Sequence, residues 1–442
     1  MPARLIIAAI AGIALLLVLI IRFKLQAMVA ILIGAVLIGL GAGMSFEQIV
    51  SSVNDGIGGT LQGIALLVGL GSMFGAILEI SGGAQSLAAI MVRKFGDRKA
   101  AWALAITGMV IAIPVFFDAG LIILIPIAFS LAKRTGKSTL YYAVPLLAGL
   151  AVGHAFIPPT PGPILVASML GVDLGWVILI GLICGAVSLI VAGPVWGAYC
   201  GRKYNIPVPE HIADIKENGK MPKLVTVVFI ILIPLVLIIL KSVANVVPAL
   251  EPARPVLSFL GEPFVALTIA TLAAMLILGI KQGYTTGELE KVMTKSLEPV
   301  GLILLVTACG AVLRYILQNS GLGALIGEGV ASAAMPFVVV AFIVAALVRI
   351  SVGSATVAMT MAAGILASMP EISLLSPAHL ACVTAAVAGG ATVCSHFNDS
   401  GFWLVKTLLG MDEKTTLRTW TVMETIVGCT GFVVALVISA FV

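Results

Sequence analysis

The sequence predicts an all-α polytopic membrane protein, and two observations lead to this prediction. Of the 442 residues, 60% are hydrophobic and only 10% are charged, and the mean hydropathy is +1.18. A water-soluble domain of this length would not stay dispersed with such a composition. Apolar runs of about 20 residues, enough to cross a hydrocarbon core of roughly 30 Å, recur from Leu5 to the C-terminus. The solvent for most of the chain is therefore the lipid bilayer.

The charge and cysteine patterns argue against other classes of protein. The net charge is +5, but Lys and Arg gather in short clusters between apolar runs, for example in residues 93–99 and 133–137. This is the positive-inside pattern of cytoplasmic loops and not a nucleic-acid-binding surface. The six cysteines form no CxxC pair and no zinc-ligand spacing, so we expect no metal site. The first apolar run ends at Arg22 without a small-residue cleavage site, which predicts a retained helix.

Most of the apolar runs are predicted to cross the membrane once, as helices, because lipid leaves no other partner for their backbone groups. These predicted spans are residues 5–21, 25–43, 61–80, 141–170, 176–198, 224–247, 264–280, 297–318, 378–409 and 421–442. We expect about 10–11 transmembrane helices in all.

Two further apolar stretches, residues 102–131 and 337–369, are long for one span and short for two. Each contains helix-breaking or small polar residues at its middle. Lys and Arg flank the first stretch on both sides, which places both of its ends in the cytoplasm and its tip near Asp118. Counting the predicted membrane crossings onward from the first stretch places both ends of the second stretch outside, where its flanks lack Lys and Arg. We therefore expect two re-entrant hairpins that enter from opposite faces, with both chain termini external.

These features indicate two repeats of inverted topology. Residues 71–83 resemble residues 310–322, and a predicted hairpin follows each. After each hairpin comes a helix interrupted by polar and helix-breaking residues, in 141–170 and in 378–409. Paired interruptions of this kind indicate the binding site of a carrier. The predicted segments are residues 1–60 (N-terminal helices), 61–200 (first repeat), 201–223 (cytoplasmic loop), 224–296 (connecting helices) and 297–442 (second repeat).

The two hairpin tips and the two broken helices form four interruptions, which should meet. Free backbone groups are tolerated in a bilayer only where they face protein or a wet cavity. They would surround a substrate near the midplane, and half-helix N-termini there would favour an anion. Arg349 lies close to the second tip in an apolar run, so it needs an anionic partner. That partner is a substrate carboxylate, an acidic coupling residue or the carboxylate of a static ion pair. Ser351, Gly353, Ser354 and Thr356 at the tip could bind substrate or only allow close helix packing.

Three acidic residues are candidates for proton coupling. Asp118 is the first, because two phenylalanines precede it and desolvation would let it gain and release a proton. Glu79 is the second, unless it lies at the membrane edge as a solvated residue. Asp399 is the third. Alternatively, Asp399 and its neighbour Asn398 could bind sugar hydroxyls or cap the half-helix that follows.

His154 and His396 occupy similar places in the two interrupted helices. No further ligand at metal spacing and no HExxH motif accompanies them. We therefore expect hydrogen bonds to the substrate, with a structural role as the alternative. The predicted substrate-binding residues are Arg349, Ser354, Thr356, His154, Thr160, His396, Asn398 and Asp399.

At these residues the sequence resembles the gluconate permease (gluconate:proton symporter, GntP) family of the ion-transporter superfamily. The matching stretches are residues 58–61, 81–85, 116–120, 154–163, 349–358 and 395–403. The resemblance implies that the chain imports gluconate or a related sugar acid with protons across the inner membrane, with the proton as coupling ion and no other cofactor. By superfamily analogy it implies a homodimer whose transport domain moves as an elevator against a scaffold formed by residues 1–60 and 224–296.

Two positions depart from the family pattern. Family members often have Glu where Asp118 stands, which keeps the carboxylate but changes its reach. They often have His where Thr160 stands, so this chain lacks a ring that could contact substrate. The particular sugar acid is therefore open, and D-serine carriers also occur in the family. Residues 397–403 look closer to the sugar-acid branch.

Rival functions follow from the same residues. A sodium-coupled carboxylate or D-serine-type carrier on the same architecture is the nearest, because hairpin hydroxyls and free carbonyls could coordinate Na⁺. An intramembrane hydrolase would use Asp118 and Asp399 as an aspartyl pair, but the Gly-x-Gly-Asp context of such proteases is absent. A channel would need rings of like residues along one path.

Overall fold

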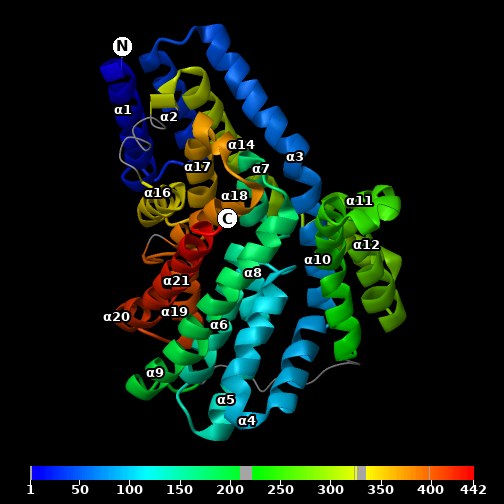
Figure 1. Ribbon diagram of the computed structural model, residues 1–442. Coiled ribbons are helices and arrows are strands. Elements are labelled where there is room, and N and C mark those ends of the chain that lie inside the picture. Colours follow the sequence, from blue (N-terminus) through cyan, green and yellow to red (C-terminus); the bar gives the residue numbers. More distant parts are fainter. Residues whose placement is uncertain (1, 210–221, 323, 326–334, 398) are drawn as a thin grey trace.

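The computed structural model describes residues 2–209, 222–322, 324–325, 335–397 and 399–442, and every regular element in these ranges is helical. In Figure 1, α1 and α2 lie at one end of the helix bundle and α4 and α5 at the other. The α-helices are α1 (Pro2–Ile21), α2 (Ala27–Ala42), α3 (Phe46–Ile80), α4 (Gly83–Ala112), α5 (Phe117–Thr135), α6 (Leu140–Phe156), α7 (Pro161–Leu170), α8 (Leu174–Ile190), α9 (Trp196–Lys203), α10 (Leu224–Val246), α11 (Arg254–Leu260), α12 (Pro263–Ala274), α13 (Thr286–Lys295), α14 (Glu298–Asn319), α16 (Phe337–Val352), α17 (Ala355–Ala367), α18 (Pro377–Gly390), α19 (Ser400–Leu409), α20 (Glu413–Thr416) and α21 (Val422–Ser439). A π-helical segment, η6 (Leu417–Thr421), leads into α21.

Long apolar helices make the chain a multi-pass membrane protein. In the described ranges, 6 helical runs are long and apolar enough to cross a bilayer, and α3 with α4, which meet at 61°, would make a seventh span. Shorter apolar helices, α1, α2, α16, α17 and α18, complete the set. The sequence analysis predicts a larger number of spans because it also counts runs that fold into these shorter helices.

Each predicted hairpin consists of two helices that are joined by a short break and contact each other. The breaks are residues 113–116, between α4 and α5, and residues 353–354, between α16 and α17. At the second break Gly353 has a φ of 82°, a conformation that costs glycine little because it has no Cβ. Helix α4 begins at Gly83 and has a kink at Gly96, whose φ of 69° and ψ of 170° are not helical. The basic cluster of residues 93–99 lies at this kink, and the first arm of the hairpin follows it.

The two predicted broken helices are also interrupted. Residues 157–160 separate α6 from α7, and residues 391–399 separate α18 from α19. A Pro-Pro pair lies in the first interruption, and proline stops a helix because it has no N–H to donate. The second interruption ends at Asp399, which caps α19 by accepting a hydrogen bond of 3.1 Å from the backbone N–H of Gly401.

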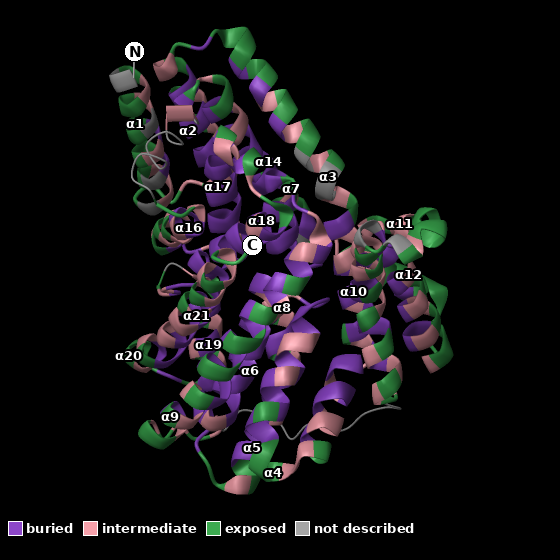
Figure 2. Ribbon diagram, in the orientation of Figure 1, coloured by how far each residue is buried: buried purple, intermediate pink, exposed green. Residues whose placement is uncertain are grey.

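Glycines bring the central helices into backbone contact. Figure 2 shows α6, α17 and α18 as largely buried, and nearly every residue of α6 and α18 is buried. A Cβ on Gly149 of α6 would lie 2.1 Å from the carbonyl oxygen of Ala105 in α4, and one on Gly390 of α18 would lie 2.4 Å from that of Phe342 in α16. Each hairpin therefore packs on its broken helix through a glycine, as membrane helices do where they approach closely.

We predict that Gly149→Ala destabilises the protein by about 1–3 kcal/mol, because the added methyl group meets backbone atoms that cannot yield without moving a helix. Gly301→Ala in α14 is the matched control, since a Cβ there has no neighbour within 4 Å. Thermal unfolding in detergent measures the difference. Equal midpoints for the two variants would contradict the packing argument.

Candidate functional site

A cavity of about 410 Å³, called here the central cavity, lies where the two hairpins and the two broken helices meet. Each of these four parts contributes lining residues, and Ile303 of α14, Trp420 of η6 and Glu424 of α21 complete the lining. The predicted site residues that line it are Asp118, His154, Arg349, Ser354, Thr356 and Asp399. The structure therefore brings together side chains that are far apart in the sequence.

Four helices begin at the central cavity. Its lining includes Phe117, Pro161, Ala355 and Ser400, the first residues of α5, α7, α17 and α19. The first turn of a helix has free N–H groups and the positive end of the helix dipole. Helix N-termini therefore favour anions, and four of them around one cavity favour a negatively charged ligand.

Arg349 is the cation of the central cavity and is only 3% exposed. Its Nη2 lies 2.5 Å from Oδ2 of Asp399, and its Nη1 donates to the carbonyl oxygen of Gly353. The guanidinium group thus joins the tip of the second hairpin to the second broken helix. Removing one partner of such a buried pair typically costs about 3–5 kcal/mol, because the other charge is left uncompensated.

A chain of hydrogen bonds extends from Asp399 to η6. Asp399 also accepts a hydrogen bond from Oγ of Ser395, and this oxygen accepts one of 2.7 Å from Nε1 of Trp420. Thr421 donates through Oγ1 to the carbonyl oxygen of Ser395. The Trp420 ring also packs on Phe117, with centroids 5.4 Å apart, so it contacts both halves of the chain. Such π-helical segments often occur at functional sites.

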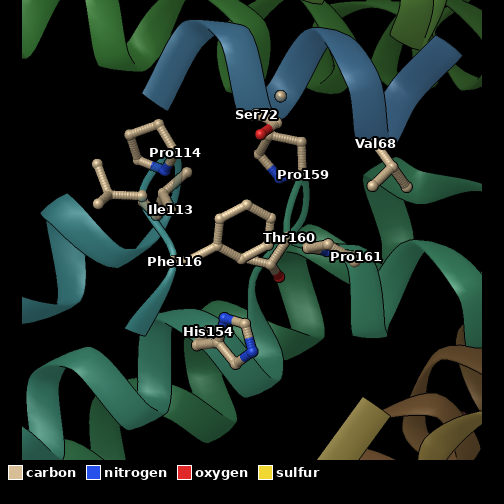
Figure 3. A pocket seen from close by; sticks show the side chains of 11 residues that line it. Val68, Ser72, Ile113, Pro114, Phe116, His154, Pro159, Thr160 and Pro161 are labelled. Atoms are coloured by element: carbon tan, nitrogen blue, oxygen red, sulfur yellow. The ribbon is translucent and has the colours of Figure 1, made fainter. Parts of the chain in front are cut away.

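Figure 3 shows a second, smaller cavity of about 20 Å³, lined by Ser72, Phe116, His154 and Thr160 among others. Thr160 lines this cavity and not the central one, and its Oγ1 donates to the carbonyl oxygen of Ile157 at 2.7 Å. His154 lines both cavities. Its Nδ1 atom is buried and has no hydrogen-bond partner among the described residues.

The three carboxylates that the sequence analysis suggests for proton coupling have different surroundings. Asp118 lines the central cavity and is exposed to it. Asp399 is half-buried and paired with Arg349. Glu79 is exposed near the end of α3 and does not line the central cavity.

Two further predicted residues are not placed in the central cavity. His396 lies with its Nε2 atom 3.1 Å from the carbonyl oxygen of Ile350, so it contacts the second hairpin from outside the lining. Asn398 lies outside the described residues. Ser351, near the same tip, donates to the carbonyl oxygen of Leu347 at 2.8 Å and is also not part of the lining.

Glu424 is a lining residue that the sequence analysis misses. It lies in the first turn of α21, it is 4% exposed, and it lines the central cavity. The signal was present, because Glu424 is the one charged residue within 421–442 and a carboxylate inside a membrane span marks a functional site by default.

Comparison with known proteins identifies the family. The pattern described as "GntP family permease" matches residues 3–441. The chain is 38% identical to the low-affinity gluconate transporter of Escherichia coli (strain K12) over 98% of both chains. It is 36% identical to a gluconate permease of Pseudomonas aeruginosa over 99% of this chain and 98% of the relative. It is 34% identical to the inner membrane permease YgbN of E. coli over 96% of both.

Solved structures with similar folds are also transporters. The YdaH transporter of Alcanivorax borkumensis superposes with a TM-score of 0.62 at 16% identity, covering 90% of this chain and 89% of that one. MtrF of Neisseria gonorrhoeae superposes with a TM-score of 0.62 at 14% identity, covering 88% of this chain and 83% of that one. At these identities the likeness concerns the fold alone. Because the matched family and relatives are named permeases and transporters, the enzyme alternative is set aside. The chain belongs to the GntP family of permeases and is a multi-pass transporter of the inner membrane.

Proposed function

We propose that this transporter imports gluconate or a related sugar acid together with protons. Relatives that match along the whole chain are named as gluconate transporters, and one, 35% identical, as an L-idonate transporter. The central cavity, about 410 Å³, falls within the roughly 300–1,000 Å³ of small-molecule sites. The observation that carries the proposal is the meeting of Arg349 with four helix N-termini, an arrangement suited to a carboxylate.

Charge balance supports the proton as partner of the substrate. The described lining has one cationic side chain, Arg349, and three carboxylates, Asp118, Asp399 and Glu424. A sugar acid adds another negative charge and competes with Asp399 for the guanidinium group. Unbalanced charge is costly away from water, and protons that bind to carboxylates remove the imbalance. Substrate and proton then strengthen each other's binding, as linkage requires.

The residues around Arg349 fit the rest of a sugar acid. In this proposal Arg349 binds the carboxylate, Ser354 and Thr356 bind hydroxyl groups, and His154 donates from the opposite half. Asp399 returns to Arg349 when the substrate leaves. Thr160 and His396 act from outside the lining, by holding the first broken helix and the second hairpin in place.

We extend the proposal to the architecture. The pairs α4–α5 with α6–α7 and α16–α17 with α18–α19 are two inverted repeats, and both hairpins are re-entrant. In support, each half has the same order of parts and packs its hairpin on its broken helix through a glycine. Transport then proceeds as an elevator movement of these parts against a scaffold within a homodimer, and alternates access to a site held by both halves.

We predict that Arg349→Ala lowers gluconate affinity about 100-fold or more, because truncating a buried charged partner costs about 2–5 kcal/mol. Binding to purified protein measures this. Arg98→Ala, which changes an exposed arginine of α4, is the control. If the single variant fails to fold because Asp399 is left unpaired, the double variant Arg349→Ala/Asp399→Ala removes both charges. Wild-type affinity in either folded variant would exclude Arg349 as the carboxylate ligand.

A second prediction concerns the coupling ion. In proteoliposomes, a pH gradient that is acidic outside should drive gluconate accumulation at equal sodium on both sides. A sodium gradient at equal pH should not. Accumulation driven by the sodium gradient would show that Na⁺, and not the proton, is the coupling ion. Competition by L-idonate, D-serine and dicarboxylates then defines the substrate class, and we expect inhibition by the sugar acid but not by D-serine.

A further inference from the structure

Glu424 is a buried carboxylate without a hydrogen-bond partner among the described residues. It is 4% exposed and lines the central cavity. It forms no hydrogen bond and no ion pair with any residue that the structure describes. An ionised carboxylate is expensive in such surroundings, whereas a protonated one is not.

The neighbours of Glu424 hold it firmly beside the second broken helix. On one side of it in the sequence, Trp420 and Thr421 bind Ser395. On the other side, Oγ1 of Thr425 accepts a hydrogen bond of 3.1 Å from the backbone N–H of Cys394. The backbone at Glu424 is therefore fixed to the interruption that ends at Asp399.

The charged and titratable groups around Glu424 come from several elements. Arg349 of α16 and Asp399 of the second interruption interact with it electrostatically. Asp118 of α5 and His154 of α6 line the same cavity. Helices α8 and α18 also contact α21 but supply no charged side chain to the described lining. The guanidinium group of Arg349 thus lies near two carboxylates, and of these two it forms an ion pair with Asp399.

From this geometry we infer that Glu424 is the residue that carries the coupled proton, an inference that rests on the proposed symport. When the substrate carboxylate binds Arg349, Asp399 loses its cation and negative charge gathers beside Glu424. A proton from water then forms an O–H bond on the Glu424 carboxylate and restores the balance. When the substrate leaves, Asp399 bonds Arg349 again and the proton returns to water. Asp118 suits this task less well, because it is exposed to the cavity.

The test uses the full-length protein in proteoliposomes and the nearly isosteric variant Glu424→Gln, which resembles the protonated form. We expect gluconate–gluconate exchange to persist, because the binding residues are intact. Accumulation driven by a pH gradient should fall to the equilibrium level. In the wild type, gluconate affinity should strengthen as pH falls and binding should take up protons from a dye-buffered solution, and both effects should be lost in the variant.

Matched variants make the outcome decisive. Glu424→Asp keeps a carboxylate and should keep pH-driven accumulation, and Glu298→Gln, an exposed glutamate in the first turn of α14, should behave as wild type. Wild-type accumulation in Glu424→Gln would overturn the inference. Loss of accumulation in Asp118→Asn would then identify Asp118 as the residue that carries the coupled proton. Loss of exchange in both Glu424 variants would make Glu424 a structural or substrate-binding residue. Failure of the wild type itself to accumulate gluconate would instead overturn the symport.

Discussion

A broken helix in a membrane must find new partners for the backbone groups that it frees, and this constraint organises the molecule. Lipid offers none. Side chains provide several of them: Arg349 donates to the carbonyl oxygen of Gly353, Thr160 to that of Ile157, and Thr425 accepts from the N–H of Cys394. Residues at or beside each of the four interruptions line the central cavity. The same four interruptions that weaken the helices therefore create a polar site deep in an apolar protein.

Much of the fold follows from the sequence because its signals are local. Apolar runs and paired helix-breaking segments predict where helices lie and where they stop, and the four predicted interruptions are found as breaks. The extent of individual helices is harder. Helical turns lie on both sides of Gly96, within the basic cluster that the sequence presents as a loop, and Gly96 itself departs from helical geometry. Local composition cannot distinguish these cases, since the outcome depends on what the following turns pack against.

The site was predictable in part. Residues at the interruptions, such as Arg349 and Asp399, reach the cavity because the interruptions themselves must meet there. Glu79 and Glu424 show the limit of this reasoning. Each is a lone carboxylate in an apolar run, yet one is exposed and the other is buried in the wall of the cavity. Which face of a helix points inward is set by packing between helices, and no repeat or motif in a single sequence records it.

The two halves of the chain contribute unequally to the central cavity. The second half supplies its guanidinium group and the hydrogen-bond chain from Asp399 to Trp420, whereas the first half supplies two phenylalanines, Asp118 and His154. In the proposed function, Arg349, Ser354 and Thr356 of the second half bind the substrate, and the first half adds His154. Substitutions around His154 can then change which sugar acid fits while the Arg349–Asp399 pair stays intact. Such a separation gives one transporter scaffold a direct route to new nutrients.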